Sequence, residues 1–263
     1  MAVTGVPSGT APTASRYTPP RTLTTAWLIA RRGALESLRD RSTMMSSTVF
    51  ALVIPAVLAV LVVRPQLAHV ASGKAAAIGT SMAAYLLIVG LLPSSGSIGI
   101  AAGVFAGEKE QGNLAPLLAT PASNGAIFAG KVLGAVLPSL LYAVVAEVVY
   151  LGGVALLSGV DRLRLLPPAL SLAMVAFVPV VAVMGAAVAS VISSRVRTYN
   201  GAQVLTSLVL LPIMGGLFGL AFEMRQWGPL TLFAVVAALV LLDAALIALG
   251  AATWRREEVM ARQ

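Results

Sequence analysis

The chain contains no cysteine and only one histidine, His69. The lack of cysteine excludes disulfide bonds, thiolate zinc sites and cysteine nucleophiles. His69 lies in a short segment between two apolar stretches, beside Arg64 and Lys74, without a neighbouring carboxylate or second histidine. We therefore interpret it as a solvated loop residue.

Charged residues are also scarce. They make up 11% of the 263 residues, against 58% hydrophobic residues and a mean hydropathy of +0.92; a soluble domain carries about 25% charged residues. So few charges cannot cover a water-facing surface, so lipid must contact most of the exterior. The net charge is +8, but the basic residues fall mostly outside the apolar runs, which favours a lipid bilayer as partner and not nucleic acid.

Six apolar stretches reach the length of about 20 residues that a helix needs to cross a bilayer. They run over residues 45–63, 77–106, 126–157, 168–192, 204–222 and 229–254. The second and third exceed one span, so we expect a kink or turn near Pro93, Gly96 and Gly99, and another at Pro138. The predicted fold is all-α and polytopic, with six transmembrane helices over residues 44–254. Glycines such as Gly134, Gly185, Gly215, Gly216 and Gly219 suit close helix packing.

The segments at the two ends differ from the spans. Residues 1–20 are rich in Pro, Ser, Thr, Gly and Ala, which predicts a disordered tail and no signal peptide. Over residues 21–43, Leu23, Trp27, Ala30, Ala34 and Leu38 recur at helical spacing. This predicts an amphipathic helix in the membrane interface, with Trp27 as its anchor, that can also lean on protein. Residues 255–263 form a short tail.

The basic residues set the expected orientation. Thirteen of the 18 Lys and Arg lie in the N-terminal segment, the loop over residues 107–125 with the following Lys131, the loop over residues 193–203 and the C-terminal tail; five lie in the alternate loops. This asymmetry predicts that both termini lie in the cytoplasm. We expect the chain to lie in the inner membrane of a bacterium.

Two acidic residues, Glu147 and Asp243, lie within predicted spans. An ionisable group in lipid is costly and is by default a candidate functional residue. The alternative is that each faces the bundle interior and is satisfied there; for Glu147, Tyr150 is a possible local partner and the structural interpretation is slightly favoured.

The loop over residues 107–124 combines charge with helical leucines. Glu108, Lys109 and Glu110 directly follow a span, and Leu114, Leu117 and Leu118 precede Thr120-Pro121. A short amphipathic helix of this kind suits docking onto a cytoplasmic partner, but it equally suits a solvated loop whose leucines dip into the interface.

The same residues resemble the signature region of type-2 permeases of ATP-binding-cassette (ABC) transporters. The matching elements are Gly107-Glu108-Lys109-Glu110, Gly112, Asn113-Leu114, Leu117-Leu118, Thr120-Pro121 and Gly130-Lys131. The resemblance extends to the plan of an amphipathic N-terminal helix, six spans and cytoplasmic termini.

The resemblance implies that the loop is a cytoplasmic coupling helix seated in a separate ABC ATPase subunit. The residues expected to contact or support this partner are Glu108, Lys109, Glu110, Leu114, Leu117, Leu118 and Pro121. It further implies two ATPase copies, a second permease subunit of the same or a homologous kind, and ATP with magnesium held by the partner. The expected function is a permease subunit, with export favoured over import.

One motif in the chain resembles a nucleotide-binding site. The segment from Gly125 to Lys131 fits the letters GxxxxGK of a phosphate-binding loop, but Val132 replaces the Ser or Thr that would hold magnesium, and no buried strand precedes it. We therefore expect no cofactor and no ATPase activity in this chain. One remaining alternative is an ATP-independent channel or secondary carrier, but such a protein would need more buried charges than Glu147 and Asp243. Another is an intramembrane enzyme, but the chain lacks the motifs HExxH and GxSxG.

Overall fold

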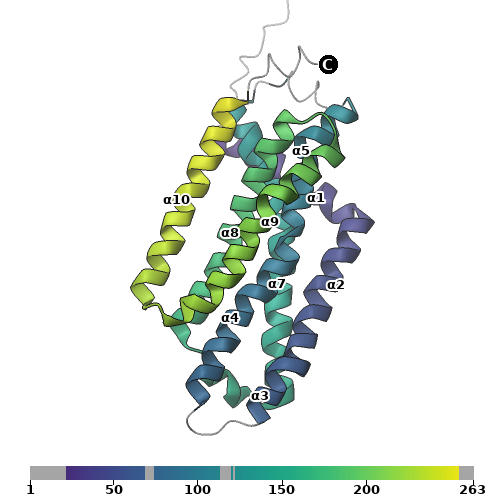
Figure 1. Ribbon diagram of the computed structural model, residues 1–263. Coiled ribbons are helices and arrows are strands. Elements are labelled where there is room, and N and C mark those ends of the chain that lie inside the picture. Colours follow the sequence, from purple (N-terminus) through teal and green to yellow (C-terminus); the bar gives the residue numbers. More distant parts are fainter. Residues whose placement is uncertain (1–21, 69–73, 113–119, 121, 255–263) are drawn as a thin grey trace, which may run out of the picture.

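The computed structural model describes residues 22–68, 74–112, 120 and 122–254, in which every regular element is helical (Figure 1). The elements are α1 (Thr22–Arg39), α2 (Arg41–Val57), the π-helical η1 (Leu58–Val63), α3 (Arg64–Ala68), α4 (Ala75–Ser94), α5 (Gly96–Glu110), α7 (Asn124–Ser158), the 3₁₀-helical η2 (Val160–Leu165), α8 (Pro168–Arg195), α9 (Tyr199–Glu223), the 3₁₀-helical η3 (Met224–Gln226) and α10 (Pro229–Thr253). Six stretches are long and apolar enough to cross a membrane: α2 through α3, α4 with α5, α7, α8, α9 and α10. The predicted all-α fold with six spans is confirmed.

The two long stretches behave differently at their prolines. The helix over residues 75–110 is interrupted at Ser95, two residues after Pro93, as predicted. The hydroxyls of Ser94 and Ser95 donate to the carbonyls three residues earlier and so compete with regular helix bonding there. By contrast, α7 continues through Pro138 for 35 residues, so the break expected at Pro138 is absent. At about 1.5 Å per residue this helix is roughly 52 Å long, which exceeds the hydrocarbon core.

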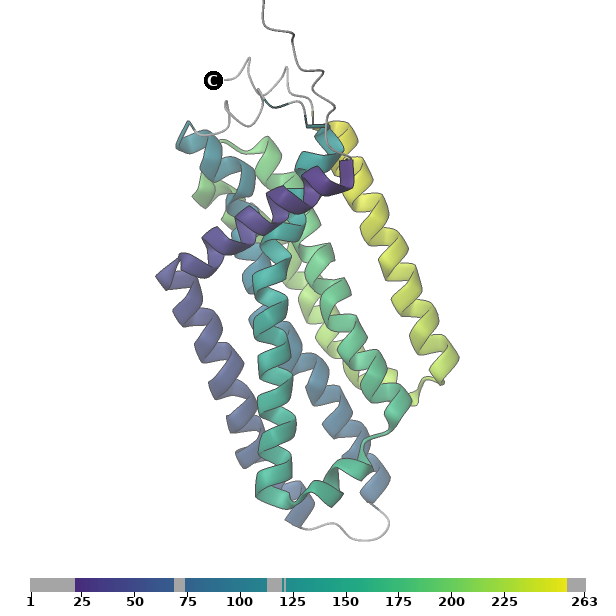
Figure 2. The same ribbon diagram turned by 180° about the vertical axis from the view of Figure 1, so that it is seen from behind.

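The helices surround α7 and α8. α7 contacts α1, α2, α4, α5, α8 and α10, whereas α8 contacts α4, α5, α9 and α10. α2 and α10 form opposite edges of the bundle in both views (Figures 1 and 2). Large apolar side chains remain exposed on α10 and on η1, which continues α2, including Leu61 at 68%, Leu241 at 72% and Leu249 at 61%. An exterior of this composition is suited to lipid.

α1 crosses the end of the bundle obliquely and lies on α7 (Figure 2). Its buried residues are Ala26, Ala30 and Ala34. A Cβ atom on Gly130 would lie 2.7 Å from the Ala26 carbonyl oxygen, so the two backbones can approach only because position 130 has no side chain.

This packing revises one part of the predicted amphipathic pattern. Ala30 and Ala34 face α7 and do not share an exposed apolar surface with Leu23 and Trp27, which are 85% and 55% exposed. The predicted contact of α1 with protein is confirmed. Placement of Leu23 and Trp27 in the membrane interface, with Trp27 as anchor, stays a prediction.

One end of the bundle carries α1, the end of α5, the start of α7, the end of α8, the start of α9 and the end of α10 (Figure 1). We call it the α1 end. The elements η2 and η3 lie at the opposite end. The predicted tails over residues 1–20 and 255–263, and His69, lie outside the described residues.

Candidate functional site

The charged run predicted to be functional lies at the α1 end, in the last turn of α5. Glu108 pairs with Lys131 in the second turn of α7, with 2.6 Å between Glu108 Oε2 and Lys131 Nζ. The Lys131 side chain is only 7% exposed, whereas that of Glu108 is 37% exposed. Glu108 and Lys131 belong to two different parts of the sequence match to type-2 permeases, more than 20 residues apart, and the structure joins them as an ion pair.

Lys131 is held by more than this carboxylate. Its ammonium donates to the Val104 carbonyl at 2.9 Å and lies 5.0 Å from the centre of the Phe105 ring. Phe105 in turn stacks on Phe128, with ring centres 5.7 Å apart, and meets Trp254 at 5.3 Å. A buried ammonium needs such partners because an unpaired charge away from water is strongly destabilising.

Lys109 connects the end of α5 to the end of α8. Its ammonium donates to the carbonyls of Ser194 and Val196. Carbonyls in the last turn of a helix have no partner within the helix and carry the negative end of its dipole, so a cation there is favourable. Lys109 thus satisfies groups that the end of α8 would otherwise leave to solvent.

Glu110 connects the same turn to α9. Its Oε2 accepts a hydrogen bond from the backbone N–H of Tyr199, the first residue of α9, at 3.0 Å. A carboxylate at a helix N-terminus satisfies an unpaired donor and interacts favourably with the dipole. The three consecutive charged residues therefore attach α5 to α7, α8 and α9 respectively, an arrangement that we call the α5 clamp (Glu108, Lys109, Glu110).

Ser193 reinforces the clamp and was missed by the sequence analysis. Its fully buried hydroxyl accepts from the backbone N–H groups of Phe105 and Ala106, at 3.1 and 2.9 Å, and donates to the Ala102 carbonyl at 2.6 Å. This single side chain of α8 is thus inserted into the hydrogen-bond pattern of α5. One serine among several in an apolar helix gives no motif from which this contact could be inferred.

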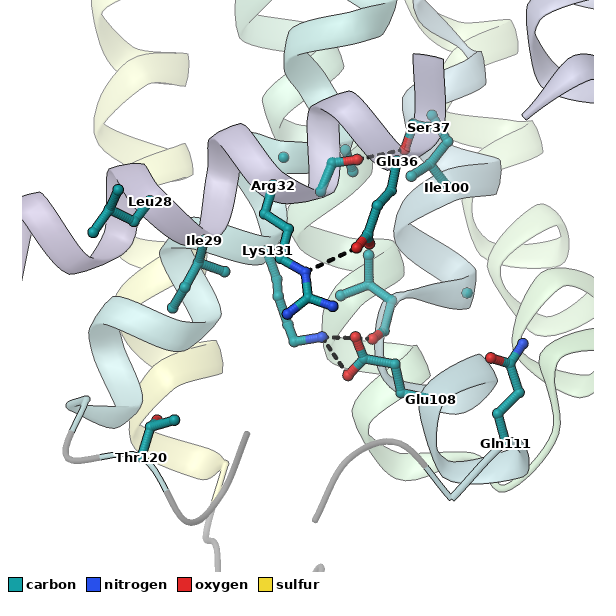
Figure 3. Close-up of a pocket in the computed structure, with 15 residues that line it drawn as sticks. Leu28, Ile29, Arg32, Glu36, Ser37, Ile100, Glu108, Gln111, Thr120 and Lys131 are labelled. Atoms are coloured by element: carbon teal, nitrogen blue, oxygen red, sulfur yellow. Dashed lines mark hydrogen bonds and ion pairs between the residues drawn. The ribbon is translucent and has the colours of Figure 1, made fainter. Parts of the chain in front are cut away.

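A half-open pocket of about 800 Å³ lies between α1, α5 and α7 (Figure 3). We call it the α1 pocket. Its lining comprises Leu28, Ile29, Arg32, Gly33, Glu36, Ser37, Ile100, Gly103, Val104, Glu108, Gln111, Thr120, Lys131, Gly134 and Ala135. Arg32 Nε donates to Glu36 Oε1 at 2.8 Å, and this hydrogen bond and charge raise the pKa of Arg32 above its ordinary value.

The other predicted coupling residues, Leu114, Leu117, Leu118 and Pro121, lie outside the described residues. Gln111, which precedes these residues, and Thr120, which lies between Leu118 and Pro121, both line the α1 pocket.

The intramembrane carboxyls lie away from the clamp and the pocket lining. Glu147 in α7 is 9% exposed, and a Cβ atom on Gly90 of α4 would lie 2.8 Å from its Oε1, so glycine makes room for this carboxyl. Tyr150 is not its partner, because the tyrosine hydroxyl donates to the Met82 carbonyl at 3.2 Å. Asp243 in α10 is 6% exposed, and its Oδ1 has no hydrogen-bond partner within the described part of the chain.

One further prediction concerns the match to a phosphate-binding loop. The whole GxxxxGK segment lies inside α7, whose first N–H groups are capped by the Ser123 hydroxyl at 3.2 Å to Ala126 N, so it forms a helix and not a phosphate loop. Among the described residues there is no group of three or more His, Asp or Glu side chains that could hold a metal ion.

Comparison with known proteins gives one family. A family model described as ABC-2 type transporter matches residues 24–227, well over half of the chain. The matched region begins in α1 and contains the first five spans, the α5 clamp and Lys131. The comparison with curated proteins finds no match.

Proposed function

Because the chain belongs to the ABC-2 type transporter family, a family of multi-pass membrane transport components, we propose that it is the permease subunit of a bacterial exporter driven by separate ATPase subunits. The observation that carries the proposal is the α5 clamp. The predicted coupling segment begins directly after a turn that is fixed to α7, α8 and α9.

A clamp of this kind suits the transmission of force. When two ATPase subunits close around ATP, a coupling segment seated in them moves with them. Since Glu108, Lys109 and Glu110 attach the adjoining turn to three other helices, those helices move together with α5. Rigid-body movement of packed helices then opens or closes the substrate path.

The proposed orientation places the α1 end in the cytoplasm. This puts the clamp, the coupling segment and both termini on the side where ATP is available, in a bacterial inner membrane. It agrees with the excess of Lys and Arg in the segments of this end. In the assembled transporter the chain pairs with a second permease, identical or homologous, and with two ATPase subunits that hold ATP and magnesium.

The experiment that tests this role changes the coupling segment without touching the clamp. Leu114→Ala with Leu117→Ala should weaken co-purification with the ATPase subunit and lower substrate-stimulated ATP hydrolysis. A loss of about 1–3 kcal/mol of contact corresponds to roughly 5- to 150-fold weaker association. The matched control is Leu156→Ala, a leucine 89% exposed near the opposite end of α7.

The control variant should keep wild-type coupling, and both proteins should unfold at the wild-type temperature. If the double variant binds and couples like the wild type, the segment is a solvated connector. An ATP-independent channel or secondary carrier then becomes the better assignment, with Glu147 and Asp243 as its first residues to test.

A further inference from the structure

The α1 pocket has two chemically distinct walls. Leu28 and Ile29 from α1 and Ile100 and Val104 from α5 supply its large apolar side chains, which together we call the apolar wall, and the remaining lining is mostly polar or charged. A volume of about 800 Å³ lies within the range of about 300–1,000 Å³ that is usual for small-molecule sites. The pocket is therefore large enough for an amphiphilic molecule.

The charged side chains of the lining differ in their availability. Lys131 is buried and already bonded to Glu108, Val104 and the Phe105 ring. By contrast, Arg32 and Glu36 have side chains that are 82% and 63% exposed, and their bond uses only Nε of Arg32 and Oε1 of Glu36.

Arg32 and Glu36 can therefore take a ligand. In Figure 3 the Arg32 guanidinium points from α1 toward Glu108 across the pocket. Its terminal nitrogens make no hydrogen bond to any residue that the structure describes. An exposed pair of residues four apart on a helix contributes only about 0.3–0.5 kcal/mol, so a ligand can share or replace this bond at small cost.

We propose that the α1 pocket binds a phospholipid whose zwitterionic head group carries a primary ammonium and a phosphodiester, the ethanolamine type. Arg32 binds the phosphodiester through its terminal nitrogens, Glu36 accepts hydrogen bonds from the ammonium, and the apolar wall contacts the first carbons of the acyl chains.

The balance of charge in the lining selects this class. Two cations, Arg32 and Lys131, stand against two carboxylates, Glu36 and Glu108. Since Lys131 and Glu108 already pair with each other, an anionic head group bound to Arg32 would lie beside the Glu36 carboxylate, and a simple cation bound to Glu36 would lie beside the Arg32 guanidinium. A zwitterion avoids both repulsions, and a primary ammonium, unlike a quaternary one, can donate hydrogen bonds to Glu36.

The position of the pocket favours a lipid over a soluble zwitterion. Leu28, which lines the pocket, is 53% exposed, and α1 also exposes Trp27 and Leu35 at 55% and 45%. A helix with leucines and a tryptophan exposed beside basic residues is suited to the level of the lipid head groups. With α1 in the membrane interface, as predicted from the sequence, the mouth of the pocket lies at the depth of the phospholipid head groups.

The test titrates lipids with identical acyl chains and ethanolamine, glycerol or choline head groups into detergent-purified protein, with bound lipid counted by native mass spectrometry. The ethanolamine lipid should bind about 5-fold or more tightly than the other two. Arg32→Gln and Glu36→Gln should each remove most of this preference. Arg31→Gln, on the same helix but outside the pocket lining, should keep it.

A second set of measurements distinguishes binding of the whole lipid from binding of its head group alone. Leu28→Ser should weaken binding of the lipid, whereas Leu35→Ser, outside the lining, should not. The proposal is overturned if all three lipids bind alike, if Arg32→Gln keeps the preference, or if glycerophosphoethanolamine binds as tightly as the lipid. The last result would show that the apolar wall contributes nothing.

Discussion

The ion pair between Glu108 and Lys131 makes an asymmetric prediction about stability. Glu108→Ala leaves the ammonium of Lys131, whose side chain is 7% exposed, without its carboxylate. Removing one partner of a buried pair costs about 3–5 kcal/mol; we expect the lower end, about 3 kcal/mol, because the Val104 carbonyl and the Phe105 ring still face the ammonium.

Substitution of Lys131, the other partner, should destabilise the fold less. Lys131→Met keeps a flexible stem against Phe105 and leaves Glu108, whose side chain is 37% exposed and can turn toward water. We expect a loss of about 1 kcal/mol. The double variant, Glu108→Ala with Lys131→Met, removes both charges and should be close to Lys131→Met alone, because the costly unpaired ammonium is absent.

The assay is reversible unfolding of the four proteins in one detergent, followed by tryptophan fluorescence or circular dichroism. A difference of about 3 kcal/mol is a change of roughly 150-fold in the folded-to-unfolded ratio, well above experimental error. Asp161→Ala is the control, since its pair with Arg164 joins side chains that are 88% and 85% exposed at a distance of 3.6 Å. The reasoning is refuted if Glu108→Ala is no more destabilised than Lys131→Met.

Three further predictions follow from the packing and the assignment. Gly130→Ala should loosen α1 from α7 and lower the unfolding temperature, because the new Cβ would lie 2.7 Å from the Ala26 carbonyl oxygen, whereas Gly125→Ala, with open space around it, should not; protease accessibility of α1 reports the difference. A reporter enzyme that works only outside the cytoplasm should be inactive when fused after Gln263 and active in the segment containing Arg162, and the reverse result contradicts the proposed orientation. The purified chain without its partner should show no ATP hydrolysis above the background of a mock purification.

The spans could be predicted from the sequence because lipid imposes a local rule. Each crossing helix must be apolar over about 20 residues, and this shows in the composition without knowledge of any partner. The break near Pro93 was predictable for the same reason, since a missing N–H acts locally. Pro138 shows the limit: proline permits a break, but packing of α7 against its neighbours decides, and the helix continues.

Glycine packing was predicted only in part. A Cβ atom added to Gly134 would lie 3.1 Å from the Ala30 carbonyl oxygen, and one added to Gly185 would lie 2.9 Å from the Ile98 side chain, so both glycines allow close packing. An added Cβ on Gly215, Gly216 or Gly219 would meet nothing within 4 Å in the described chain. Small residues permit close approach, but which helix approaches depends on the arrangement of the whole bundle, which no local pattern contains.

The charged run shows why a correctly chosen residue can be given an incomplete role. In sequence, Glu108, Lys109 and Glu110 form a solvated cluster at a helix end, and nothing local indicates that their partners are Lys131, the end of α8 and the start of α9. Because Glu108 neutralises a buried ammonium, Glu108→Ala should also destabilise the fold. A loss of transport in Glu108→Ala would therefore mix instability with uncoupling. Changes in the coupling segment itself test transmission of force without disturbing this ion pair. The double variant Glu108→Ala with Lys131→Met tests the loss of the ion pair without leaving an unpaired ammonium.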